Sequence, residues 1–387
     1  MRIAMVGPFG FHPKKTMRSR AFRLARALAQ REHQVQLFMP PWHTPDKANT
    51  SWTEDGVQIR YVALQGGHFS ITRRLIRETL AFAPDIVHCF KPKAYSGLAA
   101  WWFWRFHRRR LRLVVDSDDW EGWGGWNELE AYSPLQKRFF AWQERWGMRH
   151  CHTLTVASRA LETLALAHRV PAHRVHYLPN GPGIAGAVDP ARAARKRATL
   201  QLSKRPVVLL YSRLFEFDTQ RLVDVLAQVH EKLPDLAILS VGAGLFEDDA
   251  TLFRHQLQAA NLLDAVVDVG WTTEAELPAL LAAADVGLYL IDDSLLNRTK
   301  CPVKLADMLS VGLPVVAEAV GQVTAYVRHR ETGLVYESGD ARGLAGGVLA
   351  LLADAGLMNR LGAAARQHIQ EHFSWSRLAL ELERAYA

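Results

Sequence analysis

Runs of apolar, mostly β-branched residues alternate along the chain with segments in which apolar side chains recur every three or four positions. In the first half of the chain, strands are predicted at Arg2–Gly7, Gln34–Met39, Asp85–Cys89 and Leu111–Asp116. In the second half, strands are predicted at Val207–Ser212, Ala237–Val241, Val266–Gly270, Val286–Ile291 and Pro314–Ala317. Between the first two strands, Ala21, Leu24, Ala25 and Leu28 share one face of a predicted helix. This alternation is typical of parallel sheets covered by helices on both faces.

A loop rich in proline and glycine, Leu178–Gly183, separates the two series of strands. The sequence therefore predicts an α/β protein with two doubly wound, Rossmann-like domains joined near residues 180–200. Ligands of such sheets bind at the carboxyl ends of the strands, where helix N-termini offer free N–H groups to phosphate.

The composition and charge of the chain limit the kinds of molecule that it can bind. The 387 residues are 49% hydrophobic and 22% charged, which suits a globular protein of two domains. The net charge of +8 favours an anionic ligand or an anionic membrane face, and no motif typical of nucleic-acid binding is present in the sequence. No apolar run approaches the ~20 residues of a membrane span. Three widely spaced cysteines give neither a disulfide framework nor zinc spacing, so we expect a cytoplasmic protein.

The segment Asn297–Gly321 carries the strongest chemical signal. A helix beginning near Pro302 places Lys304 and Asp307 one turn apart on the same face. A lysine for phosphate and a carboxylate for a ribose diol would clamp a nucleoside diphosphate, whereas the alternative is an ion pair on an exposed helix. Gly312-Leu313-Pro314 then ends the helix and starts the next strand.

In this segment the chain resembles the retaining family 4 glycosyltransferases of the GT-B fold. Their signature is an acid, seven residues, a second acid and then Ala-x-Gly-x-Pro-Val-Val; here Thr299 and Asp307 take the acidic positions, ahead of Ser310–Val316. The resemblance extends through Glu331–Val335 to Phe373-Ser374-Trp375. It implies two domains facing each other across a cleft. Residues 1–182 with a crossing helix at 374–387 form the acceptor side, and residues 183–373 form the donor side.

The resemblance also implies which residues act. Tyr211-Ser212-Arg213 matches the family's phosphate-binding arginine and Gly242-Ala243-Gly244 its glycine turn, so Arg213 and Lys304 are predicted to stabilise the leaving diphosphate. The remaining residues expected at the donor site are Gly10, Gly242, Gly244, Trp271, Thr299, Lys300, Val303 and Asp307.

Three positions depart from the family pattern. The first acid is Thr299, the family's lysine after the arginine is Asp218, and the histidine after the fourth strand is Phe90, with His88 two residues earlier. We expect Lys304, with Lys300, to supply the missing cation.

The stretch Val115–Trp126, VDSDDWEGWGGW, is open to two interpretations. Asp-x-Asp after a strand is a way to hold a divalent metal, whereas carboxylates and indoles also bind sugar hydroxyls and sugar C–H faces. The GT-B resemblance favours the second interpretation, with no metal and no other cofactor. The acceptor residues expected are Arg18, His88, Lys91, Asp116, Asp118, Asp119 and Trp120, although any of the three aspartates could instead cap the next helix. Arg20, Arg23 and Arg26 are expected to be solvated.

The resemblance therefore predicts metal-independent glycosyl transfer with retention. The expected donor is a UDP- or GDP-linked sugar, and the expected acceptor is a saccharide, a lipid-linked molecule or a small molecule. The alternative is a catalytically silent homologue that binds sugar or nucleotide and acts as a membrane-associated scaffold.

One further cluster, Trp101–Arg112, joins five large aromatic residues to five arginines. Indoles and arginines are favoured at an anionic membrane surface, so this segment is a candidate for peripheral contact with the inner membrane face. The alternative is a helix that packs on the sheet and has a basic, exposed end.

Overall fold

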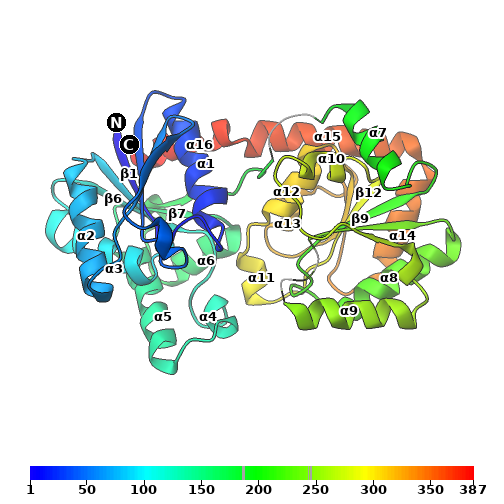
Figure 1. The fold of residues 1–387 in the computed structure, drawn as a ribbon, viewed down its shortest axis with the longest axis horizontal. Coiled ribbons are helices and arrows are strands. Elements are labelled where there is room, and N and C mark those ends of the chain that lie inside the picture. Colours follow the sequence, from blue (N-terminus) through cyan, green and yellow to red (C-terminus); the bar gives the residue numbers. More distant parts are fainter. Residues whose placement is uncertain (185–187, 243, 245) are drawn as a thin grey trace. The chain divides into compact units, whose positions relative to one another are not determined.

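The protein forms two compact units in a computed structural model, which describes residues 1–184, 188–242, 244 and 246–387 (Figure 1). Unit 1 contains Met1–Asn180, Thr299–Cys301 and Trp375–Ala387, and unit 2 contains Gly181–Arg298 and Pro302–Ser374. The two ends of the chain therefore lie in the same unit. Thr299–Cys301 packs within unit 1, although the sequence assigns the whole range 183–373 to the second domain.

Unit 1 is built on one sheet, which has eight strands within the described residues. Their order is β3-β4-β2-β1-β5-β6-β7-β8, and every neighbouring pair is parallel except β3 with β4. The strands are β1 (Arg2–Val6), β2 (Gln34–Met39), β3 (Ser51–Glu54), β4 (Val57–Tyr61), β5 (Ile86–Phe90), β6 (Arg112–Ser117), β7 (Thr153–Val156) and β8 (Val175–Tyr177).

Helices cover the unit 1 sheet. They are α1 (Phe22–Ala29), α2 (Gly67–Ala81), α3 (Ala94–His107), α4 (Trp126–Leu129), α5 (Pro134–Arg149), α6 (Arg159–Ala167) and α16 (Trp375–Tyr386). The last helix packs on α1, and its Leu378 and Leu382 join the same buried cluster as Ile3 and Met5. Apolar burial thus holds the end of the chain on the first strand.

Unit 2 has a second parallel sheet, with the order β11-β10-β9-β12-β13-β14. Its strands are β9 (Val207–Tyr211), β10 (Ala237–Val241), β11 (Val266–Asp268), β12 (Val286–Tyr289), β13 (Val315–Glu318) and β14 (Leu334–Tyr336). Its helices are α7 (Pro190–Thr199), α8 (Thr219–Lys232), α9 (Glu247–Ala259), α10 (Leu277–Leu281), α11 (Leu295–Thr299), α12 (Val303–Ser310), α13 (Val323–Tyr326), α14 (Ala341–Ala353) and α15 (Ala355–Phe373).

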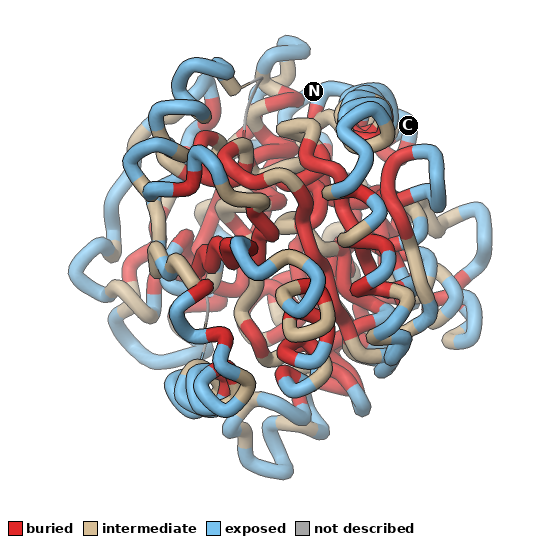
Figure 2. Tube along the Cα trace, turned by 90° about the vertical axis from the view of Figure 1, so that its right-hand side faces the viewer, coloured by how far each residue is buried: buried red, intermediate tan, exposed pale blue. Residues whose placement is uncertain are grey.

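The structure confirms each strand that the apolar runs predict, to within two residues at either end. Buried residues follow the strands, whereas loops and the outer turns of helices are exposed (Figure 2). The α/β class and the doubly wound topology are therefore correct. In each sheet the order in which the strands are added reverses next to the first strand of the unit, between β1 and β5 in unit 1 and between β9 and β12 in unit 2. Folds of this kind bind ligands at such places.

Within the described parts of the chain, no single helix is both long enough and apolar enough to cross a bilayer. Ala341–Ala353 and Ala355–Tyr386, which meet at a bend of 106°, would satisfy the same criteria only as a pair, by length and composition.

Candidate functional site

Arg213 follows the first strand of unit 2 directly. β9 ends at Tyr211, and Leu214 then adopts a left-handed backbone with φ 70°, so the chain turns sharply at the carboxyl edge of the sheet. The Arg213 guanidinium lies 3.1 Å from Glu216 Oε1 and 5.0 Å from the centre of the Phe215 ring. Its buried Nε makes no hydrogen bond to any described residue. One donor of this guanidinium is therefore still available.

Lys304 reaches the same edge from the first turn of α12. Its Nζ lies 4.3 Å from the centre of the Tyr211 ring. A methyl group added to Gly242 would stand 4.0 Å from both Lys304 Nζ and Trp271 Cε3, so the turn after β10 lies beside both side chains. Unit 2 therefore gathers a lysine, a glycine turn and an indole at the carboxyl ends of its strands.

The glycine turn after β10 needs glycine at both described positions. Gly242 and Gly244 have φ of 64° and 78°, and a Cβ on Gly244 would lie 2.7 Å from Ala250 Cβ. Ala243, the middle residue of the predicted motif, lies outside the described residues. A backbone without side chains leaves room for a ligand to approach closely.

Asp307 is buried, so the alternative of an exposed ion pair on α12 is wrong. Its Oδ1 accepts hydrogen bonds from the backbone N–H groups of Gly183 and Ile184 at 2.6 and 3.2 Å. A Cβ on Gly183 would lie 3.2 Å from Val303 Cγ1, so this loop also packs against the start of α12. Burial, and then the charge of Asp307, raise the pKa of the Tyr211 phenol. Asp307 thus joins the first loop of unit 2 to the helix that carries Lys304.

Thr299 and Lys300 were expected among the donor ligands, but both pack within unit 1. Ser158 Oγ donates to the Thr299 carbonyl at 2.8 Å, and Lys300 Nζ lies 5.2 Å from the centre of the Trp126 ring. Asp218, which replaces a lysine of the family pattern, caps α8 by accepting from the Gln220 N–H at 3.0 Å. Among the cations named from the sequence, Lys304 and Arg213 are the two that unit 2 brings to its strand ends.

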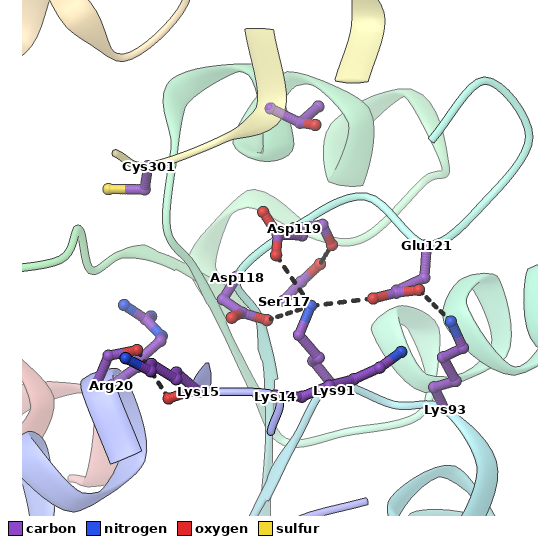
Figure 3. A network of polar contacts seen from close by, with 12 residues as sticks. Lys14, Lys15, Arg20, Lys91, Lys93, Ser117, Asp118, Asp119, Glu121 and Cys301 are labelled. Carbon is purple, nitrogen blue, oxygen red and sulfur yellow. Dashed lines mark hydrogen bonds and ion pairs between the residues drawn. The ribbon is translucent and has the colours of Figure 1, made fainter. Parts of the chain in front are cut away.

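The motif VDSDDW of unit 1 surrounds a buried lysine (Figure 3). Lys91 Nζ lies 3.4 Å from Asp118 Oδ1, 2.9 Å from Asp119 Oδ2 and 2.9 Å from Glu121 Oε1. Lys93 Nζ lies 2.5 Å from the other oxygen of Glu121. The pairing of β5 with β6 sets this geometry, because Phe90 lies opposite Asp116 and the residues that follow each strand emerge together.

The ionisation of these groups is strongly coupled. Burial would raise the pKa of Glu121, but Lys91 and Lys93 outweigh it and hold the pKa at about 2. Burial raises the pKa of Asp118 to about 7, against the pull of Lys91. Burial and the charge of Glu121 raise the pKa of Glu144 to about 8, although Ser117 Oγ donates to Glu144 Oε1 at 2.8 Å. At neutral pH the carboxyl group of Glu144 is therefore protonated.

The backbone also departs from ordinary geometry beside this network. Lys91 has φ 46° and Ala94 has φ 51°, which are uncommon values for residues other than glycine. Such strain persists only where the surrounding structure enforces it, and it gathers at functional sites.

The three aspartates do not cap a helix, because the cap of α4 is Gly125. Asp116 faces the interior of unit 1 and makes a two-bond ion pair with Arg20, at 2.8 and 2.7 Å. Both side chains are fully buried, and so is most of Arg23, so the expectation that Arg20 and Arg23 are solvated is wrong. Arg26 keeps part of its side chain in solvent and forms an ion pair with Asp55 at 3.3 Å. Asp116 therefore pairs with the buried Arg20, and its carboxylate is not exposed to an acceptor substrate.

His88 and Trp120 are also structural. His88 Nδ1 lies 2.8 Å from the Tyr386 hydroxyl, and burial lowers the pKa of His88 to about 4. The Trp120 ring stacks on His168 and donates from Nε1 to the Trp123 carbonyl, and side chains at Gly122 or Gly125 would collide with it. Neither ring is open to a sugar, and the prediction that both contact the acceptor is wrong.

Arg18 and Gly10 likewise have local roles. Arg18 forms an ion pair with Glu54 at 2.7 Å and lies over the Phe22 ring at 4.5 Å. Gly10 lies against the Tyr61 hydroxyl, which a Cβ would approach to 2.9 Å. Neither residue joins the Lys91 network, which consists of Lys91, Lys93, Asp118, Asp119 and Glu121.

Sequence reasoning missed Glu121, Lys93 and Glu144. Glu121 lies in the quoted motif itself and Lys93 is two residues after Lys91, so their nearness was visible in the sequence. Glu144 gave a weaker signal, as the one acid of a helix rich in aromatic and basic residues. In the parts of the chain that the structure describes, no three His, Cys, Asp or Glu side chains are arranged to hold a metal ion.

Comparison with known proteins identifies the family and the fold. The model of the glycosyl transferase 4-like domain matches residues 16–181, and that of glycosyl transferases group 1 matches residues 205–354. A structure of Anabaena HepE in complex with UDP superimposes with a TM-score of 0.73 at 18% identity, over 99% of each chain. The fold is therefore GT-B. The chain belongs to the family 4 glycosyltransferases, as the signature around Asp307 predicts.

Two curated relatives are mannosyltransferases. The GDP-mannose-dependent alpha-(1-6)-phosphatidylinositol monomannoside mannosyltransferase of Mycobacterium tuberculosis is 30% identical over 218 residues, which span 55% of this chain and 55% of the relative. The phosphatidyl-myo-inositol mannosyltransferase of Mycobacterium leprae is 24% identical over 399 residues, which cover 100% of this chain and 96% of the relative. The first alignment thus covers about half of either protein.

Proposed function

We propose that the protein transfers a sugar, with retention of anomeric configuration, from a nucleoside diphosphate sugar to an acceptor hydroxyl. The observation that carries this proposal is the convergence of Arg213, Lys304, Tyr211 and Gly242 at the strand ends of unit 2. Two cations beside a glycine turn suit a diphosphate, because bare backbone lets the phosphates come close while fixed charges neutralise them.

Each part of the donor has a candidate partner in unit 2. The diphosphate lies on Arg213 and Lys304, near the first N–H groups of α12. Trp271 is largely exposed beside Gly242 and offers an indole face to the base. Asp307 fixes Gly183 and Ile184 and accepts from the ribose hydroxyls. The M. tuberculosis relative is named for GDP-mannose and the HepE structure contains UDP, so a GDP- or UDP-linked hexose is the proposed donor.

The acceptor is proposed to bind the Lys91 network of unit 1. Asp119 is the most exposed carboxylate of the network, and its oxygens can accept from sugar hydroxyls. Trp123 exposes about half of its surface on the same loop, where its ring can cover a sugar face. Both curated relatives are named for phosphatidylinositol acceptors, which favours a lipid-linked acceptor here.

The proposed reaction needs no protein nucleophile. The bond between the anomeric carbon and the diphosphate oxygen breaks while the acceptor oxygen bonds to the same face of that carbon. The acceptor proton passes to the departing diphosphate. Arg213 and Lys304 stabilise the charge that grows on this leaving group, which lowers the barrier.

The position of Thr299 within unit 1 favours one rival, a homologue that binds the nucleotide but does not react. Calorimetry with GDP and UDP, followed by assay of sugar release from a panel of donors, separates the two. We expect micromolar binding of one diphosphate, weaker binding by Arg213→Ala, and slow release of sugar from the matching donor. Binding without release from any donor would support the silent homologue, and no binding of either diphosphate would overturn both.

A further inference from the structure

α5 buries two polar side chains and exposes large apolar ones, which is unusual for a surface helix in water. Gln143 and Glu144 are buried, whereas Leu135, Phe139 and Trp142 are 78%, 40% and 41% exposed. Surface helices normally turn their apolar stripe inward and their polar face outward. The exposed apolar side chains of α5 would therefore be more stable against an apolar partner than in bulk water.

The aromatic rings of α5 form a ladder that continues onto α3. Phe139 stacks on Trp142 with centroids 5.8 Å apart, Trp142 lies 6.1 Å from Trp146, and Trp146 stacks on His150 at 4.3 Å. Trp104 of α3 is 6.1 Å from His150. α3 packs between α5 and α2 (Figure 1) and exposes Trp101, Trp102 and Phe106. The apolar surface thus spans two helices, and patches of that kind mark interaction sites.

The exposed charges that α3 and α5 themselves carry are positive. Arg138, Arg145 and Arg149 are exposed on α5, whose one carboxylate, Glu144, is buried. α3 has no acidic residue, and it runs into the exposed Arg108-Arg109-Arg110. On the neighbouring α4, Glu128 lies 3.8 Å from Lys137 of α5. A surface in which indoles and guanidinium groups predominate complements an anionic lipid headgroup layer.

We propose that this aromatic–arginine face, formed by the exposed side chains of α3 and α5, docks unit 1 on a membrane that contains anionic lipids. Indoles and phenyl rings seat at the headgroup level, and each arginine adds attraction to the charged leaflet. On α2, which packs on α3, Phe69 is 85% exposed, and Arg73 and Arg77 follow one and two turns further on. Docking would give the enzyme access to a lipid-linked acceptor. This purpose rests on the proposed function, whereas docking itself does not.

Co-sedimentation with vesicles tests the docking. The wild-type protein should bind vesicles of phosphatidylcholine with phosphatidylglycerol, release them in high salt, and remain in solution with phosphatidylcholine alone. The double variant Trp142→Ser, Arg145→Gln should bind about tenfold more weakly. The matched control is Leu252→Ser, Arg254→Gln on α9 of unit 2, which also removes one exposed apolar residue and one arginine and should bind like the wild type.

Three results would overturn the inference. The first is that the wild type does not bind anionic vesicles, and the second is that both double variants lose vesicle binding equally. The third is that the protein binds single-stranded RNA more tightly than vesicles, and that Trp142→Ser, Arg145→Gln weakens the binding of RNA as much. Calorimetry of the wild-type protein with the nucleoside diphosphate keeps the two proposals apart. If the wild type binds anionic vesicles but no nucleoside diphosphate, the donor site alone is contradicted. If it binds a nucleoside diphosphate but no anionic vesicles, docking alone is contradicted.

Discussion

The ammonium group of Lys304 lies 4.3 Å from the centre of the Tyr211 ring. This contact fixes a flexible lysine over the end of the first strand of unit 2, where a diphosphate would lie. The ring face attracts the ammonium group and holds it at this edge of the sheet.

Lys304→Met should lower kcat/KM for the donor by about 10²–10³-fold, because a fixed cation that stabilises the leaving group is lost. Steady-state kinetics with saturating acceptor measures this effect. Tyr211→Phe is the matched control, since it keeps the ring beneath the ammonium group and should change the rate little. Full activity in Lys304→Met would remove this lysine from the donor site.

Asp307→Ala should raise the donor KM and also destabilise the fold by about 1–3 kcal/mol, because two buried N–H groups lose their acceptor. Asp307→Asn keeps an oxygen for Gly183 and should lose less stability, while its donor KM still rises. Donor titration and urea denaturation of both variants separate binding from folding. A change in acceptor KM with donor KM constant would contradict the assignment.

Lys91 Nζ lies within 3.4 Å of carboxylate oxygens of Asp118, Asp119 and Glu121. Lys91→Met should therefore destabilise the protein, because buried carboxylates then repel one another. Urea denaturation of the variant and of the wild type measures the loss. Equal stability of the two proteins would mean that the carboxylates do not depend on this cation.

The pH dependence of stability follows from Glu144. Its pKa is about 8 in the folded protein and near 4.5 when unfolded, so between these values the folded state holds one more proton. Stability should fall by about 1.4 kcal/mol for each pH unit that the solution rises through this window, and level off above it. Glu144→Gln preserves the acceptor for Ser117 and should remove the part of the slope that Glu144 contributes, whereas Asp118, whose pKa burial raises to about 7, keeps its own part. Urea denaturation from pH 5 to 9 tests the difference, and parallel profiles for the two proteins would refute it.

Asp119→Asn should raise the acceptor KM without changing the donor KM. The amide keeps one acceptor oxygen but loses the charge that strengthens hydrogen bonds from sugar hydroxyls. Initial rates at varied acceptor concentration measure the change. Glu128→Gln on α4 removes an exposed carboxylate outside the network and serves as the control.

The sequence predicted what local patterns determine. Buried parallel strands need continuous apolar runs, so β1, β2, β5 and β6 were visible. The edge strand Ser51–Glu54 has no such run, although Asp55-Gly56, a favoured two-residue hairpin turn, leads directly into β4 and would have revealed it.

The candidate site was predictable only in part. Lys304 and Asp307 could be predicted as neighbours because they share one turn of one helix, α12. The pairing of Arg20 with Asp116 joins residues 96 positions apart, and neither neighbourhood in the sequence reveals it. Likewise, Thr299 keeps its place in the motif, but its contact with Ser158 across 141 positions decides the unit in which it packs.

The return of Trp375–Ala387 to unit 1 sets an order of events during synthesis. Domains generally fold as they leave the ribosome, N-terminal part first. Here the first Rossmann sheet must wait for the last helix to cover it, and until then Ile3, Met5 and their neighbours lack part of their apolar cover. The second sheet, with all its strands and its own helices already made, can complete its core earlier, so the half of the protein that is translated first is the half that matures last.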